Sequence, residues 1–201
     1  MLASGISPSD LLDELNSCGT DIASGEDVEL YKDGEFSEGL MIEHLKKLLR
    51  ITNLTEEQQY ILCNLSLMPS SGIWKNPFGK WLQLENLTDI NRLIKYGFIS
   101  EDTEQRTIAL HPLIREIAEK ETQPTISACS NLWNYLHAVI IVHGLDVSRP
   151  SVMINVIDSM IIHIIIDDNE EYLLFLQDLF PYYQKYKADE PLHRLVERIE
   201  Y

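Results

Sequence analysis

Hydrophobic side chains recur at helical spacing along most of the chain, and this pattern predicts a mainly α-helical protein. The best-specified helix begins after Thr55, because Thr55 and Gln58 form a capping box in which each side chain reaches the other residue's backbone amide. Pro69 and Gly72 then end the segment. The predicted buried positions of this helix are Ile61, Leu62, Leu65 and Met68.

Three more helices are predicted between this one and residue 122. The first is short and lies around residues 78–82, and the second covers residues 87–96 and stops at Gly97. The third covers residues 113–120 and follows His111. The positions expected to face inward are Leu87, Ile90, Leu93 and Ile94 in the second of these helices, and Leu113, Ile114 and Ile117 in the third.

A polar turn between two short apolar runs predicts a β-hairpin. Residues 98–99 form the first predicted strand and residues 107–110 the second. The resulting order of helix, short helix, helix, hairpin and helix is that of a winged helix, which predicts a winged-helix domain over residues 55–122. Leu65, Leu93 and Leu113 are expected to meet in its core.

The two flanking segments are also predicted to be helical. Residues 1–54 contain two apolar runs at helical spacing, separated by the polar, acidic stretch 20–39. Residues 123–201 read as helices throughout, which suggests a repeat array of the tetratricopeptide type without a clear internal repeat. Three helices are expected there over residues 152–166, over residues 170–186 with a kink at Pro181, and from Pro191 onward. The helix that precedes them has a predicted stripe at Ile126, Cys129, Leu132, Trp133 and Leu136.

The net charge of the chain indicates which classes of partner are disfavoured. The 201-residue chain carries a formal charge of −16 and a pI near 4.6, with the acidity in its two end segments. Binding to DNA, RNA or an anionic membrane needs clustered Lys and Arg, so none of these is favoured. The predicted wing is itself acidic, with Glu101, Asp102 and Glu104 against Arg106. A DNA-binding winged helix is therefore kept only as an alternative.

Cysteine content and hydropathy indicate a cytoplasmic chain. The three cysteines, Cys18, Cys63 and Cys129, are widely spaced, which argues against a disulfide framework or a zinc site. The N-terminal stretch lacks the cationic and apolar regions of a signal peptide. The most apolar run, residues 151–166, is too short for a membrane span.

Motifs for catalysis are lacking in the sequence. There is no phosphate-binding GxxxxGK[ST] loop, GxGxxG, GxSxG or HExxH. His163 and Asp167 have the spacing to share one helix face and a divalent metal, but Asp167 and Asp168 are better explained as the solvent-facing end of a buried helix. We therefore expect no enzyme active site, no metal and no cofactor within this chain.

His111 is the one polar residue that stands out. It lies where the second predicted strand meets the last helix of the middle segment, followed by Pro112 and, further on, by Arg115 and Glu116. An imidazole at a helix start can donate a hydrogen bond to an anion, and it can equally cap the helix. The residues alone favour the cap and leave both roles open.

Four runs in the sequence resemble the winged-helix part of NB-ARC proteins, signal-transduction ATPases of the STAND class that are common in bacteria. The runs are HLKKLLRITNLTEEQQYILCNLSLMPSSGI, FGKWLQL, INRLIKYGFI and IALHPLIREIA. Leu110, His111 and Pro112 resemble the family's MHD motif, with Pro112 in place of the Asp of plant members. By the same resemblance, residues 1–54 look like the end of the ARC subdomain with its linker, and residues 123–201 like the start of a tetratricopeptide-type sensor.

The resemblance implies a regulatory, non-catalytic segment of a nucleotide switch. In such proteins the motif histidine contacts the β-phosphate of ADP in the closed state, so His111 would be the ADP sensor. The nucleotide-binding domain would precede Met1, and ADP or ATP is implied only for a longer parent protein. The expected partners are that domain or other proteins, and a helical-repeat adaptor stays as a further alternative. Self-association into a homo-oligomer through exposed Trp74 and Phe78 is also expected.

Overall fold

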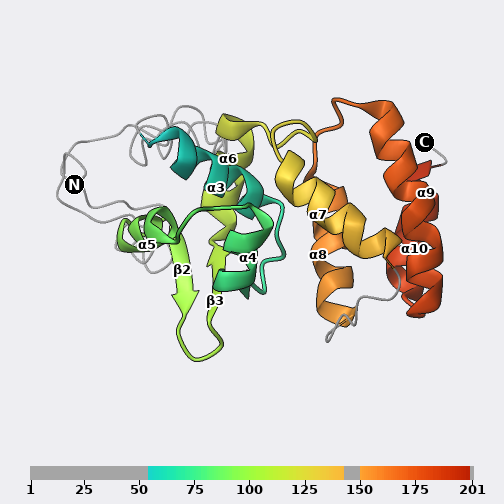
Figure 1. Ribbon diagram of the computed structural model, residues 1–201, viewed down its shortest axis with the longest axis horizontal. Coiled ribbons are helices and arrows are strands. Elements are labelled where there is room, and N and C mark those ends of the chain that lie inside the picture. Colours follow the sequence, from blue (N-terminus) through green and yellow to red (C-terminus); the bar gives the residue numbers. More distant parts are fainter. Residues whose placement is uncertain (1–53, 143–149, 200–201) are drawn as a thin grey trace, which may run out of the picture.

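The described part of the chain is mainly helical, as predicted. Figure 1 shows the computed structural model, which describes residues 54–142 and 150–199. These residues contain eight α-helices and one three-stranded antiparallel sheet. The two helices expected between residues 1 and 54 lie outside the described residues. Among the helices that are described, none has the length and apolarity needed to cross a membrane.

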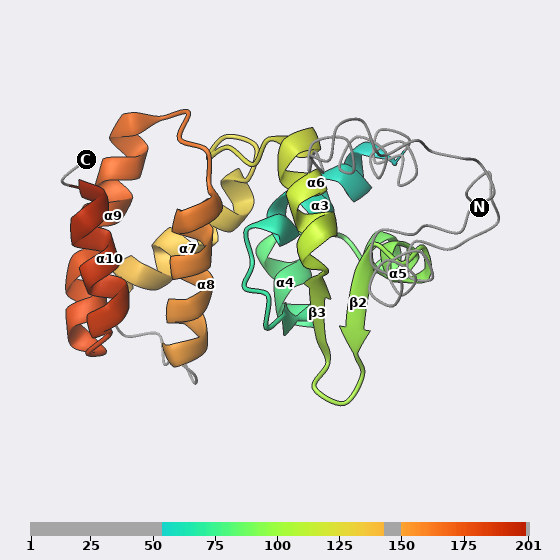
Figure 2. The same ribbon diagram turned by 180° about the vertical axis from the view of Figure 1, so that it is seen from behind.

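The described elements form two groups that follow each other along the chain (Figures 1 and 2). The first group contains the sheet and four helices, and the second contains four helices only. The first group comprises α3 (Glu56–Ser66), β1 (Ile73–Trp74), α4 (Lys75–Trp81), α5 (Thr88–Lys95), β2 (Ile99–Asp102), β3 (Thr107–Leu110) and α6 (Pro112–Thr122). The second comprises α7 (Ser130–Ile141), α8 (Pro150–His163), α9 (Asn169–Lys185) and α10 (Asp189–Ile199).

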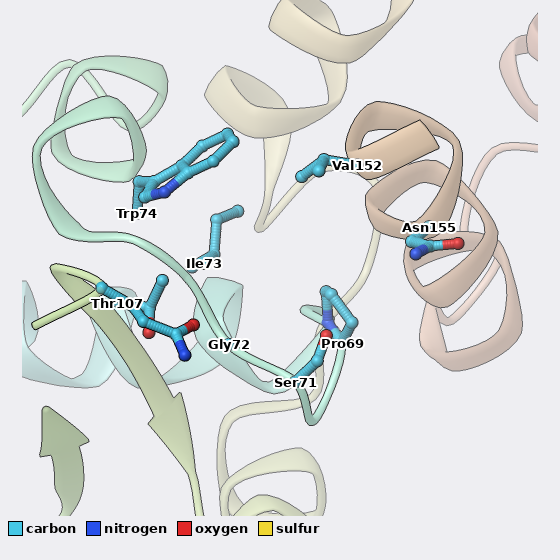
Figure 3. Close-up of a pocket in the computed structure, with 9 residues that line it drawn as sticks. Pro69, Ser71, Gly72, Ile73, Trp74, Thr107, Val152 and Asn155 are labelled. Atoms are coloured by element: carbon cyan, nitrogen blue, oxygen red, sulfur yellow. The ribbon is translucent and has the colours of Figure 1, made fainter. Parts of the chain in front are cut away.

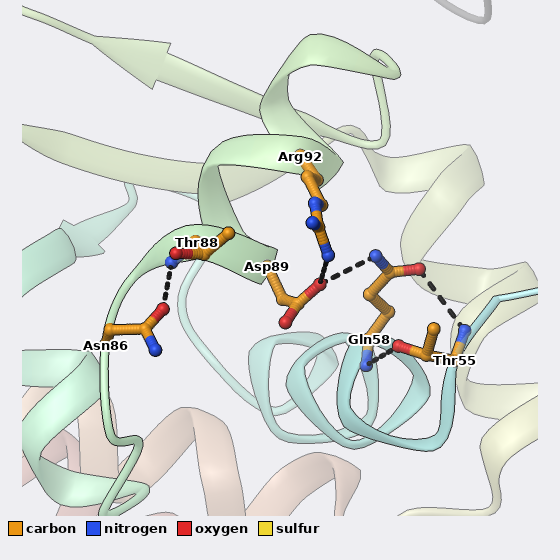
Figure 4. A network of polar contacts seen from close by, with 6 residues as sticks. All are labelled: Thr55, Gln58, Asn86, Thr88, Asp89 and Arg92. Carbon is orange, nitrogen blue, oxygen red and sulfur yellow. Dashed lines mark hydrogen bonds and ion pairs between the residues drawn. The ribbon is translucent and has the colours of Figure 1, made fainter.

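The predicted capping box opens α3 and also ties this helix to α5. The Thr55 amide donates to Gln58 Oε1 at 3.2 Å, and the Gln58 amide donates to Thr55 Oγ1 at 3.3 Å. Gln58 Nε2 donates in turn to Asp89 Oδ1 at 2.8 Å, and Arg92 Nη1 donates to the same oxygen at 3.1 Å (Figure 4). Gln58 therefore takes part both in the capping box of α3 and in a tertiary contact with α5.

The hairpin was predicted in the right place, but its first strand is longer than expected. β2 continues through Asp102, whose Oδ1 accepts from the amides of Glu104 and Gln105 at 2.9 Å and so forms the turn. Arg106, with φ of 58°, completes it. Polar residues such as these give no apolar alternation, so the sequence pattern ended the strand too early.

The third strand, β1, was not predicted. Its two residues follow Gly72, which has φ of 87°, and they pair with Thr107 and Ile108 of β3, so that the sheet order is β1-β3-β2. A two-residue strand has no measurable periodicity, and its pairing is decided by a partner more than 30 residues away. Tertiary contact, and not local pattern, forms this strand.

The core of the first group forms largely on the predicted positions, but Leu87 and Ile94 of the α5 segment are only partly buried instead of fully inward. Leu65 and Leu93 are buried, with exposed fractions of 1% and 0%, but Leu113 is only partly buried. The inward face of α6 consists of Ile114, Ile117 and Ala118. Each helical residue rotates by about 100°, so Leu113 lies at the edge of that face.

The second group buries the predicted stripe from Ile126 to Leu136 completely or almost so, although α7 itself begins only at Ser130. The expected helix over residues 152–166 ends early, at His163. Ile165 instead forms a parallel bridge with Thr125, and its amide donates to the Pro124 carbonyl at 2.8 Å. The β-branched run after His163 thus becomes extended where a neighbouring chain segment offers pairing.

The last two helices occur where the sequence placed them. Pro181 lies within α9, and Pro191 lies in the first turn of α10. Asp168 is the N-cap of α9, and its Oδ1 accepts from the Glu171 amide at 3.0 Å. The pair Asp167-Asp168 therefore leads into α9 instead of ending α8, which corrects the interpretation from sequence.

The two groups are joined by specific contacts. Asn131 Nδ2 donates to the Leu82 carbonyl at 3.1 Å, and the rings of Trp81 and Tyr135 stack with centroids 5.1 Å apart. A further contact joins α8 to α6, because His163 Nδ1 lies 3.0 Å from Glu119 Oε1. The start of α7 and the end of α8 are thus held against α4 and α6.

Candidate functional site

His111 lies between the last strand of the sheet and α6, and it is the N-cap of that helix. Its backbone is extended, with φ of −60° and ψ of 142°, and its Nδ1 accepts from the Leu113 amide at 3.4 Å. Pro112 follows at the first helical position, where no amide hydrogen is needed. The capping role that the residues alone favoured is therefore present in the structure.

This cap fixes which ring nitrogen of neutral His111 carries the proton. Since Nδ1 accepts a hydrogen bond, the proton of the neutral ring must reside on Nε2, which is then a donor. The positive end of the α6 dipole lies at the same place. Capping and donation to an external acceptor are therefore compatible in one imidazole.

Arg115 adds a cation one helical turn after His111, on the same face of α6. Its Nη2 donates to the Met68 carbonyl, just beyond the end of α3. Its Nε is buried and has no hydrogen-bond partner among the residues that the structure describes. Burial lowers the pKa of the Arg115 guanidinium, and Glu119 opposes this change. The α6 dipole, the Nε2 donor of His111 and the charge of Arg115 together favour an anion near the start of α6.

His163 and Asp167, the pair considered for a metal, are not brought together on one helix face. His163 ends α8 and faces Glu119, whereas Asp167 lies beyond the helix and accepts from the Ser127 amide at 3.3 Å. Within residues 54–142 and 150–199, no group of three potential metal ligands is found. The helix ends four residues before Asp167, so the spacing argument did not apply.

The face that would meet DNA in a winged helix has two of its cations paired with carboxylates. Lys75 Nζ forms an ion pair with Glu101 of β2 and donates to Asn91 Oδ1 at 3.2 Å. Arg92 pairs with Asp89 at 3.1 Å. A phosphate would have to compete with these internal partners.

The expected exposure of Phe78 and Trp74 was wrong for Phe78. The Phe78 side chain is 0% exposed in the core of the first group. Trp74 is half-buried and lines an open cavity of about 390 Å³ between the sheet and α8, together with Thr107, Val152 and Asn155 (Figure 3). A ring in the inward stripe of a short helix packs inside, so Phe78 offers no surface for a second copy.

The contact between the thiols of Cys63 and Cys129 was not predicted from the sequence. Their Sγ atoms lie 3.7 Å apart, both are buried, and no disulfide joins them. Sixty-six positions separate the two cysteines. Cys129 belongs to a predicted buried stripe, whereas Cys63 lies outside the buried positions predicted for its helix, so the two cysteines share no sequence signal.

Comparison with known proteins identified no similar protein. A scan against protein-family models and searches of curated proteins and solved structures found no match for this chain. Function therefore has to be inferred from the residues and their geometry.

Two substitutions at His111 separate the cap from any further role. His111→Ala should lower the unfolding free energy by about 0.5–1 kcal/mol, because the cap on the Leu113 amide is lost. His111→Asn should restore that stability, since asparagine is among the best N-caps, while removing the imidazole. Urea unfolding followed by circular dichroism measures both. A loss of 3 kcal/mol or more in both variants would show that the ring is a core residue.

Proposed function

We propose that this chain is a non-catalytic regulatory and protein-interaction segment of a nucleotide switch of the NB-ARC type. In this proposal residues 55–122 are a winged-helix domain, residues 123–201 a tetratricopeptide-like helical region, and residues 1–54 the end of an ARC-like subdomain. The winged helix would hold the ADP-bound off state in a longer parent protein. The parent would supply the phosphate-binding loop and the catalytic chemistry.

The observation that carries the proposal is the position of His111. The run IALHPLIREIA spans the junction of β3 and α6, so that the motif histidine caps the helix with Nδ1 and keeps Nε2 as a donor. Phosphate groups bind well at helix N-termini, and Arg115 adds positive charge one turn away. A single histidine and arginine would not bind ADP tightly alone, which is consistent with a sensor that completes a site on another domain.

The order of elements supports the winged-helix assignment. Three helices, a β-hairpin and a final helix follow in sequence, and a short strand before α4 pairs with the hairpin. The acidic turn and the paired cations on the α5 side favour a protein-contacting winged helix over a DNA-binding one. A stand-alone transcriptional regulator is therefore the weaker alternative.

Nucleotide content tests the proposal. The protein is isolated from its own cells with an antibody against this chain, denatured, and the released nucleotide is identified by chromatography. We expect close to one ADP per protein in the wild type and a loss of ADP in the His111→Asn variant, which keeps the helix cap. His193→Asn, an exposed histidine of α10, is the matched control and should retain ADP. An unchanged ADP content in His111→Asn would contradict the sensor role.

A helical-repeat adaptor is a second candidate, because the second group exposes apolar side chains. Leu173 and Leu174 of α9 are 58% and 51% exposed, next to polar positions of the same helix. Exposed neighbouring apolar residues mark protein contact sites. This candidate requires that a partner captured by the wild type be lost in Leu173→Asp and kept in the matched variant Asn134→Asp, which adds the same charge at an exposed position of α7.

A further inference from the structure

The two groups of helices meet at a buried pair of thiols. Cys63 lies on α3 of the first group, and Cys129 is the residue before α7 of the second. Their sulfur atoms are 3.7 Å apart, and the Cys63 thiol also approaches the Thr122 carbonyl, at the end of α6, at 3.8 Å. The pair thus occupies the joint through which α6 leads into α7.

We propose that Cys63 and Cys129 are an oxidisable dithiol that a small hydroperoxide converts into a disulfide, covalently fixing α7 against α3. A disulfide requires a sulfur–sulfur distance of about 2.0 Å, so the sulfurs would need to approach by about 1.7 Å. This is a small displacement for two side chains, one in the last turn of α3 and the other directly before α7. The proposal does not depend on the nucleotide-switch function.

The two thiols are not equivalent, and Cys63 is the one that reacts first. Cys63 is 5% exposed to solvent, whereas Cys129 is 0% exposed. The hydrogen bond from the Cys129 thiol lowers the pKa of Cys63 despite the opposing effect of burial. The same hydrogen bond, followed by burial, raises the pKa of Cys129. Cys63 is therefore the attacking thiolate and Cys129 the resolving thiol.

The reaction balances with one equivalent of oxidant. The Cys63 thiolate attacks an oxygen of hydrogen peroxide, and the oxygen–oxygen bond breaks to give a sulfenic acid. The hydroxide that leaves becomes water by taking up the proton that the Cys63 thiol released when it ionised. The Cys129 sulfur then loses its proton and attacks the Cys63 sulfur, and the sulfenic oxygen leaves as a second water. Two thiols lose two electrons in total, and the peroxide gains them.

Mass spectrometry of the whole chain tests the proposal. The reduced protein is treated with hydrogen peroxide, quenched with catalase, and alkylated with N-ethylmaleimide while it is denatured. We expect a main product that carries one maleimide, on Cys18, and a digest in which the peptides of Cys63 and Cys129 are linked. Dithiothreitol should restore alkylation of all three cysteines.

Two cysteine variants test whether the link joins Cys63 to Cys129. Cys18→Ser should form the same link, and Cys129→Ser should not form it. The thermal midpoint of the oxidised wild type should rise by several degrees, because the link closes a long loop, with no rise in oxidised Cys129→Ser. Three maleimides after oxidation, a disulfide that includes Cys18, or a sulfinic acid on Cys63 with Cys129 still alkylated would each overturn the proposal. An unchanged or lowered midpoint in the linked wild type would overturn the fixing of α7.

Discussion

Replacing Leu93 with alanine should lower the unfolding free energy by about 2–5 kcal/mol. Leu93 is 0% exposed on the inner side of α5, among the residues that join α3, the sheet and α6 into one core. Truncation removes its apolar contacts and leaves a cavity that this short helix closes only in part. Urea unfolding followed by far-ultraviolet circular dichroism gives the change.

Leu113→Ala is the matched control, because it removes the same atoms from a partly buried position. We expect a loss of about 1 kcal/mol or less, clearly below that of Leu93→Ala. Equal losses in the two variants would contradict the packing of α6 through Ile114, Ile117 and Ala118.

Trp133→Ala should be the most damaging single change in the second group, at about 3–5 kcal/mol. The Trp133 ring is 0% exposed, lies 4.2 Å from the Phe175 ring and is stacked on Tyr172 at 6.3 Å between centroids. Its removal would leave α7 and α9 without the largest side chain between them. Thermal or urea unfolding measures this loss.

Trp133→Phe provides the informative comparison. The buried Trp133 Nε1 has no hydrogen-bond partner among the described residues, so phenylalanine removes an unsatisfied donor along with some volume. We expect a smaller loss than for alanine. A loss in Trp133→Phe as large as in Trp133→Ala would show that the indole nitrogen, and not the packing, stabilises this helix pair.

Features coded by neighbouring residues could be predicted from the sequence. The Thr55–Gln58 capping box, the position of the hairpin and the buried stripe of α7 depend on spacings of a few residues, and all of them are found. Features decided by distant partners could not be predicted. Strand β1 exists only through its pairing with β3, and α8 ends where Ile165 meets Thr125.

In the candidate site, too, features set by neighbouring residues could be predicted and those set by distant partners could not. His111 could be identified as a helix cap from its neighbours Leu110 and Pro112, and the tautomer follows only from the geometry of the Leu113 amide. The thiol pair of Cys63 and Cys129 required the packing of α7 on α3, which no local spacing contains. The sequence alone was wrong about Phe78, because a short amphipathic helix does not reveal which of its rings is covered.

The size of the protein in its own cells tests the central proposal most directly. An immunoblot of whole-cell extract, with an antibody raised against this chain, reports the mass of the native polypeptide. We expect a band several times heavier than the 23.2 kDa of this chain, because in this proposal a nucleotide-binding domain precedes residues 55–122 in the parent protein. A band only at the mass of this chain would contradict the nucleotide switch and would leave an adaptor or a stand-alone winged helix.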